Sequence, residues 1–278
     1  MDEVDVDNSE ECPYNGLWIA ATCVVAITNF VACCGCFWFM GRILTAKKEV
    51  RNNTFNLYVV FLLFPDAVNN GIVSIYSVFR MTHCGVVPPF LADVHDFELF
   101  FYYFSNFYLN VVVACELFIL LKRSSNAQRT KPPPMKRAIG QITGVYVLAF
   151  LYALWACLDV PWSFYDQPNF GSPEGGIFSE TAAMAMSVAL FVIPIIIVVG
   201  IRIKVAIQKI MPKEGQTRVL SLFFERIIVV FFAFYVPTMV LNVLASFMES
   251  VQSASFFWTE MAILLLSAGQ AMLTLYMV

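Results

Sequence analysis

Long apolar blocks separated by short polar stretches set the pattern of this chain. Seven blocks stand out: Gly16–Gly41, Phe55–Phe79, Phe97–Leu121, Ala138–Leu158, Thr181–Ile201, Ile227–Met248 and Ser255–Val278. Each has the roughly 20 residues with which an α-helix crosses the hydrocarbon core of a bilayer. The pattern therefore predicts seven membrane-spanning segments in one transmembrane domain, residues 16–278, preceded by a short acidic segment, residues 1–15.

The apolar blocks are predicted to be helices rather than strands. A bilayer core offers no water to the backbone, so spanning segments are helices or the strands of a closed barrel. Barrel strands alternate polar and apolar residues, whereas Leu190–Gly200 and Ile227–Tyr235 are continuously apolar. Composition agrees, since 59% of the residues are hydrophobic and only 13% are charged, about half the charged fraction of a soluble domain. We expect an all-α membrane protein, a seven-transmembrane-helix bundle in a lipid bilayer.

Basic residues mark one face of the predicted bundle. Of the 17 lysines and arginines, all except Arg80 fall in or beside the loops after the first, third and fifth blocks. The positive-inside rule makes this face cytoplasmic, which places the N-terminus outside the cell and the C-terminus inside, at the plasma membrane. No positively charged region precedes the first block, so we expect it to act as an uncleaved signal anchor. The sequence ends at Val278, at the inner end of the last block, and a truncated chain is one interpretation of that end.

The eight cysteines do not form a disulfide framework. Five of them lie inside predicted spans: Cys23, Cys33, Cys34, Cys36 and Cys115. Cys12 and Cys84 both fall outside the cell in the predicted topology and are candidates for pairing. Cys157, near the outer end of the fourth block, is the rival partner.

Carboxylates inside the apolar blocks need an explanation, because a charge at mid-bilayer costs about 2.5–3.5 kcal/mol on insertion scales. Asp66 lies near the middle of the second block, which favours a functional polar site. Glu116 and Glu260 lie near the ends of their blocks, where reaching interface water is the simpler explanation. Glu98 lies at the outer edge of the third block.

Polar and proline residues recur inside the blocks at informative spacings. Asn56-Leu57 is followed nine residues later by Asp66, Phe191-Val-Ile-Pro194 lies in the fifth block, and Glu116 lies near the end of the third. These spacings resemble the second, fifth and third helices of rhodopsin-like (class A) G protein-coupled receptors. Glu116 falls near the position of the acid in the D-R-Y motif of that family.

The last two blocks carry further parts of the resemblance. Phe231 and Pro237 match the F-x-x-C-W-x-P motif of the sixth helix, with Phe234 and Tyr235 in place of its cysteine and tryptophan. Tyr276 falls where the tyrosine of the seventh-helix N-P-x-x-Y motif would lie. The resemblance extends over essentially the whole chain, with each motif partly matched.

Some motif positions depart from the family. Leu117 stands in place of the D-R-Y arginine that contacts the G protein, and Phe118 in place of its tyrosine. Met272 and Leu273 replace the asparagine and proline of N-P-x-x-Y. The second outer loop also lacks the cysteine that joins it to the third helix in the family. These departures concern the G protein contact more than the fold.

The resemblance implies two sites. At mid-membrane, Asp66 and Asn106 would face one another in a polar switch or ion site, for which the asparagines of the family's seventh helix have no counterpart here. In the outer half, a ligand cavity would be lined by Phe100, Tyr103, Met186, Tyr235, Met239, Asn242 and Trp258. This aromatic, nearly uncharged set favours a small lipophilic or neutral ligand over a cationic amine. Glu116, Phe231, Pro237 and Tyr276 would be the activation motifs.

The resemblance implies a divergent receptor that binds an extracellular ligand of unknown identity and signals to a cytoplasmic partner, a heterotrimeric G protein in that family. An ion or solute transporter or channel that uses Asp66 is the alternative, although no inverted repeat is visible. A covalent retinal protein would need a lysine in the last block, and no lysine follows Lys213.

Enzyme activity, cofactors, a metal site and nucleic-acid partners are not expected. The two histidines, His83 and His95, both fall in the first predicted outer loop. A membrane-embedded zinc hydrolase would need a larger cluster of histidines and carboxylates near the membrane surface.

Overall fold

The structure, a computed structural model, describes residues 16–83, 87–125, 132–157, 190, 192–208, 225, 228–229, 231–238, 240–241 and 254–277. The side chains of residues 124–125, 231, 235, 254–257, 260 and 276–277 are outside this description. The elements in the described ranges are helical: α1 (Gly16–Thr45), α2 (Lys48–Arg51), α3 (Thr54–Thr82), α4 (Pro89–Ser125), α5 (Met135–Cys157), α7 (Ile193–Gln208), the π-helical turn η3 (Phe231–Tyr235) and α10 (Ala254–Met277).

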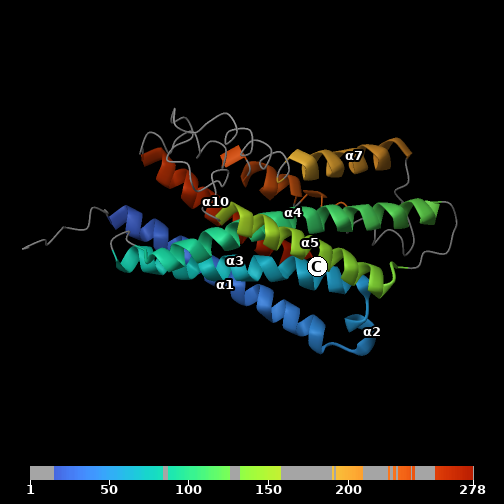
Figure 1. Ribbon diagram of the computed structural model, residues 1–278, viewed down its shortest axis with the longest axis horizontal. Coiled ribbons are helices and arrows are strands. Elements are labelled where there is room, and N and C mark those ends of the chain that lie inside the picture. Colours follow the sequence, from blue (N-terminus) through green and yellow to red (C-terminus); the bar gives the residue numbers. More distant parts are fainter. Residues whose placement is uncertain are drawn as a thin grey trace, which may run out of the picture.

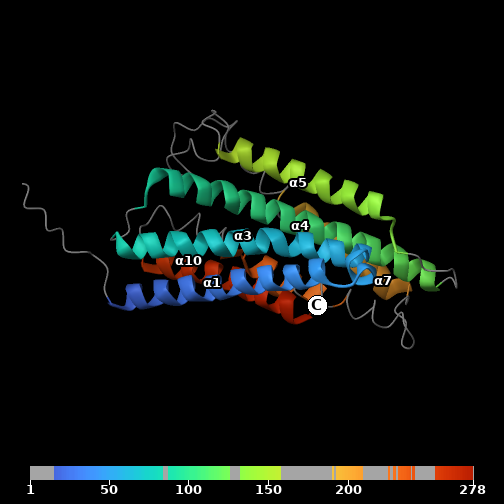
Figure 2. The same cartoon turned by 90° about the horizontal axis from the view of Figure 1, so that it is seen from below.

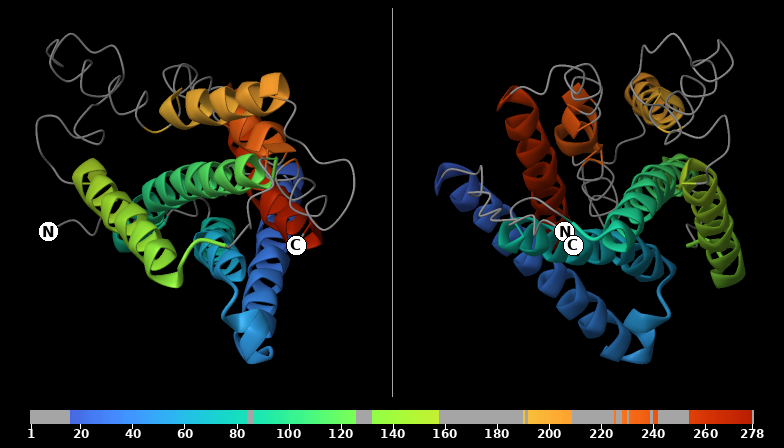
Figure 3. Two further views of the ribbon diagram at one scale, coloured as in Figure 1. Left: turned by 90° about the vertical axis from the view of Figure 1, so that its right-hand side faces the viewer. Right: turned by 60° about the vertical axis from the view of Figure 1, so that its left-hand side comes forward.

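The long helices lie side by side along the length of the molecule (Figure 1). α3 lies between α1 and α4 (Figure 2), and α5 packs against α4 and also contacts α3. α10 contacts α1 and α3, and α7 contacts α4. End-on views show these helices grouped into a bundle rather than a flat layer (Figure 3).

Four of the described helices are long and apolar enough to cross a membrane: Gly16–Thr45, Thr54–Thr82, Pro89–Arg123 and Met135–Cys157. Met261–Leu275 adds a shorter apolar helix. Large apolar side chains on α1 point outward, with Phe30 59% and Trp38 65% exposed. A bilayer, unlike water, stabilises such an apolar exterior. The chain is therefore a multi-pass membrane protein.

α4 runs through the middle of the main core. Leu109, Val113, Leu117 and Leu121 recur every four residues along it, and each is at most 1% exposed. They share one helix face and belong to a cluster that also includes side chains of α3, α5 and α7. Leu117, at the position of the family's arginine, is thus a core residue.

Pro65 lies within α3, and a neighbouring helix compensates for it. Proline has no N–H, so the carbonyl of Phe61, four residues earlier, loses its donor within the helix. The hydroxyl of Tyr146 on α5 donates a hydrogen bond to that carbonyl at 2.6 Å. The gap in the hydrogen bonding of α3 therefore becomes a contact between α3 and α5.

The π-helical turn η3 is followed closely by Pro237. A proline interrupts the regular hydrogen-bond ladder, and a π-turn is one way in which a helix accommodates such an interruption. Phe234 of η3 lies against Gly269 of α10, where an added Cβ would sit 3.0 Å from the ring atom Cε1. Glycine thus permits the close approach of these two elements.

α4 begins at Pro89, eight residues before the expected start of the third span at Phe97. Polar residues such as Asp93 and Asp96 interrupt the apolar pattern, but the helix continues through them, and proline is well tolerated in a first helical turn. At 1.5 Å per residue, Glu98 lies about 13 Å along α4 rather than at its edge.

Candidate functional site

Asp66 is the centre of a polar network in the middle of the bundle. Its side chain on α3 is 1% exposed. Asn106 of α4 donates from Nδ2 to Asp66 Oδ1 at 2.9 Å, and Gln270 of α10 donates from Nε2 to the same oxygen at 3.2 Å. Three helices therefore meet at one carboxylate, and the donors that hold it are neutral amides.

Further hydrogen bonds join the same three helices. Tyr102 on α4 donates from its hydroxyl to Gln270 Oε1 at 3.2 Å, and Ser267 on α10 donates to the Tyr102 hydroxyl at 3.2 Å. Asn69 on α3 donates from Nδ2 to Ser267 Oγ at 2.8 Å. Each helix contributes residues three or four apart, which share a face. The mid-bundle network consists of Asp66, Asn69, Tyr102, Asn106, Ser267 and Gln270.

Several oxygens around this network have no hydrogen-bond donor among the described residues. They are the side-chain Oδ1 atoms of Asn69 and Asn106, which belong to the network, and of Asn70, whose Nδ2 donates to the Asp66 carbonyl. An amide oxygen can only accept, so these atoms call for a water molecule, a cation or a ligand donor. These oxygen atoms could coordinate a small cation, and the hydrogen bonds around them suit a polar switch. These are the two roles expected for Asp66 and Asn106.

Glu98 is a second buried acid and, unlike Asp66, has no hydrogen-bond partner among the described residues. It is 5% exposed, and both of its carboxylate oxygens lack a hydrogen bond within the described part of the chain. On α4 it is four residues before Tyr102 and eight before Asn106, so it lies on the face that carries the mid-bundle network. The sequence placed it at the edge of a span, and its burial is a finding of the structure.

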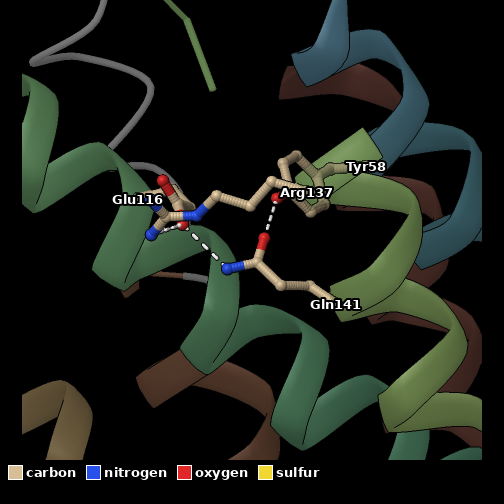
Figure 4. A network of polar contacts seen from close by, with 4 residues as sticks. All are labelled: Tyr58, Glu116, Arg137 and Gln141. Atoms are coloured by element: carbon tan, nitrogen blue, oxygen red, sulfur yellow. Dashed lines mark hydrogen bonds and ion pairs between the residues drawn. The ribbon is translucent and has the colours of Figure 1, made fainter. Parts of the chain in front are cut away.

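A separate polar cluster surrounds Glu116, as Figure 4 shows. Arg137 of α5 pairs through Nη2 with Glu116 Oε1 at 2.6 Å, and Gln141 Nε2 donates to the same oxygen at 2.8 Å. Tyr58 of α3 donates from its hydroxyl to Gln141 Oε1. The side chain of Glu116 is only 4% exposed. The expectation that Glu116 reaches interface water is therefore wrong, because an arginine and an amide satisfy it inside the bundle.

This second cluster lies at the end of the bundle where α4 finishes and α5 begins. The same end carries Arg42, Lys122, Arg123 and Lys136, and it forms the basic end of the bundle. Tyr58, Glu116, Arg137 and Gln141 make up the basic-end cluster. Among them, only Glu116 stood out in the sequence.

The residues expected to line a ligand cavity are only partly described. Tyr103 is 5% exposed and stacks on Phe107 with ring centroids 5.9 Å apart. Phe100 makes an edge contact with Tyr152 of α5, and Trp258 at the start of α10 is 48% exposed. Met186, Met239, Asn242 and the side chain of Tyr235 lie outside the described residues. The described members therefore do not yet define one cavity.

Other expected positions have similar outcomes. Pro237 is described and half-buried, whereas the side chains of Phe231, Glu260 and Tyr276 lie outside the description. Cys12 and Cys84 also lie outside it. Cys157, the rival partner for a disulfide, is a free thiol.

Sequence reasoning missed two sets of partners. Gln270 and Ser267 lie three residues apart in a mostly apolar helix, and that spacing was the available signal. Arg137 was counted only as a loop charge, although it lies one helical turn before Gln141 on the same face of α5.

A hollow of about 420 Å³ lies between α3, α4 and α5, and none of the described residues that line it belongs to either polar cluster. Its lining is apolar and includes Phe61, Phe101, Tyr146 and Phe150. Phe150 is 50% exposed, so the hollow opens to the outside of the bundle, where lipid lies, and belongs to neither candidate site.

No protein-family model matches the sequence, and no curated protein sequence matches it. Among solved structures, the chain is similar to squid rhodopsin, with a TM-score of 0.75 and 14% sequence identity over 92% of this chain and 76% of the rhodopsin chain. The fold is rhodopsin-like. The prediction of an all-α, seven-transmembrane-helix bundle is thereby confirmed, and at this identity the likeness concerns the fold alone.

Proposed function

We propose that this rhodopsin-like bundle is a signalling receptor of the plasma membrane. Its basic end would face the cytoplasm, as the positive-inside rule requires, and its opposite end would take a small extracellular ligand between the helices. The observation that carries the proposal is the mid-bundle network, in which one buried carboxylate joins α3, α4 and α10. A polar network that links several helices can change partners when the helices shift, which is what a switch requires.

The signal would pass from the ligand to the basic end through this network. A ligand in the outer half, near Tyr103, Tyr235, Met239 and Trp258, would favour one arrangement of the helices over another. Asp66 and Asn106 would exchange partners as the helices move, and the π-helical turn before Pro237 would act as a joint. Phe231 and Tyr276 would transmit this helix movement to the basic end, as their motif positions imply.

At the basic end, we propose that Arg137 supplies the positive charge that Leu117 does not. Arg137 pairs with Glu116 at 2.6 Å, yet its side chain is 47% exposed. A half-exposed arginine held by one buried acid can leave that acid when the helices separate and then contact an acidic surface of a partner. The partner would be a heterotrimeric G protein.

The proposal is tested by recovering the purified full chain, in detergent, with a heterotrimeric G protein. We expect an association that is lost when a non-hydrolysable GTP analogue is added, because nucleotide exchange releases a G protein from its receptor. An association insensitive to nucleotide, or none across the main G protein classes, would contradict the receptor proposal.

A transporter or channel is the second candidate, and the unpartnered oxygens near Asp66 favour it. Buried acids and amide oxygens in a membrane protein can mark an ion pathway. Reconstitution into liposomes loaded with a pH- or sodium-sensitive dye distinguishes the two functions. Flux that is abolished by Asp66→Asn would support transport, whereas an absence of flux would leave the receptor proposal standing.

A further inference from the structure

Two unlike donors share one oxygen of Glu116 in the basic-end cluster (Figure 4). Arg137 Nη2 lies 2.6 Å from Glu116 Oε1, and Gln141 Nε2 lies 2.8 Å from the same atom. The first donor is a cation whose side chain is 47% exposed, and the second is a neutral, half-buried amide. Glu116 is thus held by one donor that can move into water and by one that stays inside the bundle.

Tyr58 determines which end of the Gln141 amide faces Glu116. A carboxylate only accepts hydrogen bonds, so the amide must present its nitrogen to Glu116. Its oxygen accepts from the hydroxyl of Tyr58, a side chain of α3 that is only 1% exposed. An amide turned the other way would bring its oxygen against the carboxylate. Tyr58 therefore keeps Gln141 in the orientation in which it donates to Glu116.

The amide also determines what remains when Arg137 moves away. Without Gln141, the departing arginine would leave Glu116 with no donor among the described residues, and an uncompensated buried charge carries a large penalty. With Gln141 in place, Glu116 keeps one hydrogen bond and the penalty is smaller. The amide thus makes the departure of the arginine easier, although it also stabilises the resting cluster.

We propose that Gln141 is a positioning residue, which makes Arg137 releasable by keeping Glu116 hydrogen bonded. The inference rests on the proposed receptor function, because it concerns how Arg137 becomes free to contact a cytoplasmic partner. It adds that α5 supplies both the arginine that leaves and the amide that stays. These two side chains lie one helical turn apart on the same face of α5.

Tyr58 connects this step to α3, the helix that carries Asp66. The two residues are eight positions apart, about 12 Å along the helix at 1.5 Å per residue, and both are 1% exposed. A movement of α3 against α5 that separates Tyr58 from Gln141 would free the amide to turn away from Glu116. Arg137 would then be the remaining donor to Glu116 and would be retained.

The test measures how fast the guanidinium group of Arg137 reacts in the purified full chain in detergent. The reagent is 4-hydroxyphenylglyoxal, a dicarbonyl that modifies accessible arginine side chains, and peptide mass spectrometry reads each site. Arg42, an exposed arginine at the end of α1, lies outside the cluster and is the internal reference. Gln141→Leu should slow the modification of Arg137 by about tenfold relative to Arg42, as expected from the loss of a hydrogen bond to a charged group.

Three further variants complete the design. Tyr58→Phe keeps the ring but loses the hydroxyl that orients Gln141, and should slow the reaction by about threefold, the effect of one neutral hydrogen bond. Thr143→Val is the matched control, a polar-to-apolar change on α5 outside the cluster, and should leave the rate unchanged. Glu116→Gln should speed the reaction, because it removes the charge that holds Arg137.

The sign of the change separates this role from a purely structural one. If Gln141 only joined α5 to α4, its loss would loosen the contact and Arg137 would react faster. A faster or unchanged reaction of Gln141→Leu would therefore overturn the proposal. If that variant fails to fold, a faster or unchanged reaction of Tyr58→Phe would overturn it instead.

These reactions contain no G protein, so their failure and a failure of the receptor proposal can be told apart. In the association assay, Gln141→Leu should weaken the nucleotide-sensitive complex by about tenfold, the same factor by which it slows the release of Arg137. Slower modification of Arg137 together with wild-type association would support the role of Gln141 and contradict the coupling role of Arg137.

Discussion

The mid-bundle network and the basic-end cluster each bury one carboxylate, but they satisfy it by different means. Glu116 is neutralised by Arg137, whose side chain remains 47% exposed. Asp66 receives two amide hydrogen bonds, from Asn106 and Gln270. Near the end of a bundle, an arginine can pair with a buried acid while part of it stays in water. In the middle of a membrane an arginine cannot keep part of its side chain in water, so it would bury a second charge.

This difference suggests that the two regions contribute differently to stability and to conformational change. An ion pair between a buried acid and a half-exposed arginine is a strong, local contact between α4 and α5. A network of amides and hydroxyls offers several exchangeable partners of similar energy, and oxygens of Asn69, Asn70 and Asn106 are left to accept more. We therefore expect the basic-end cluster to contribute more to stability and the mid-bundle network more to switching.

The largest expected effect comes from placing the family's arginine at position 117. Leu117 is fully buried in the apolar core with Leu121 and Ala138. Leu117→Arg should lower the unfolding free energy by about 3 kcal/mol or more, because it buries a charge without a partner. Thermal unfolding and the yield of monodisperse protein measure the loss. Leu117→Met is the volume-matched control and should cost less than about 1.5 kcal/mol; equal stability of the arginine variant and the wild type would refute the account of this core.

The next largest effect comes from removing the charge of Arg137. Among the described residues, Arg137→Met leaves the buried Glu116 with only Gln141 as a partner. The variant should cost about 2 kcal/mol, the range for a hydrogen-bonded charge. Lys136→Met changes an exposed neighbour of the same charge and should cost less than about 0.5 kcal/mol. Equal midpoints for the two variants would mean that the ion pair contributes nothing to stability.

A smaller effect is expected in the mid-bundle network. Gln270→Leu removes a donor to Asp66 and an acceptor for Tyr102, and should cost about 1 kcal/mol, since hydrogen bonds between membrane helices average about 0.6 kcal/mol each. Thr274→Val is the control, because within the described part of the chain Thr274 bonds only the Gln270 carbonyl of its own helix. A loss for Gln270→Leu greater than that for Arg137→Met would reverse the comparison between the two regions.

The smallest effect tests the compensation for Pro65. Tyr146→Phe deletes the hydroxyl that donates to the Phe61 carbonyl and should lower the unfolding free energy by about 0.6 kcal/mol. Tyr152→Phe, on the same helix, removes a hydroxyl that makes no hydrogen bond with the described residues and should be nearly neutral. Indistinguishable midpoints for the two variants would mean that α3 tolerates its free carbonyl without help.

Hydropathy was sufficient to predict the fold class. Apolar blocks of sufficient length require helices, and the bounds of α1, α3 and α5 lie within a few residues of the predicted spans. The start of α4 was harder to predict, because Asp93 and Asp96 made the helix before Phe97 resemble a loop. The position of Glu98 inside the bundle depended on that start.

Residues of the candidate sites could be predicted only where they fall at the spacing of a family motif. Asp66 and Asn106 were expected to face one another, and they are hydrogen bonded. Gln270 was overlooked because the family has asparagines on this helix, whereas here a longer amide reaches Asp66. Arg137 could not be assigned to Glu116 from sequence, because their contact depends on where the chain enters α5.

The central claim is that Arg137 takes the place of the missing motif arginine in coupling to a G protein. It is tested most directly by comparing G protein association of Arg137→Met with that of Lys136→Met, using equal amounts of folded, monodisperse protein with and without a non-hydrolysable GTP analogue. The account predicts that Lys136→Met keeps most of the nucleotide-sensitive association and that Arg137→Met loses it. Equal association of the two variants would contradict the claim.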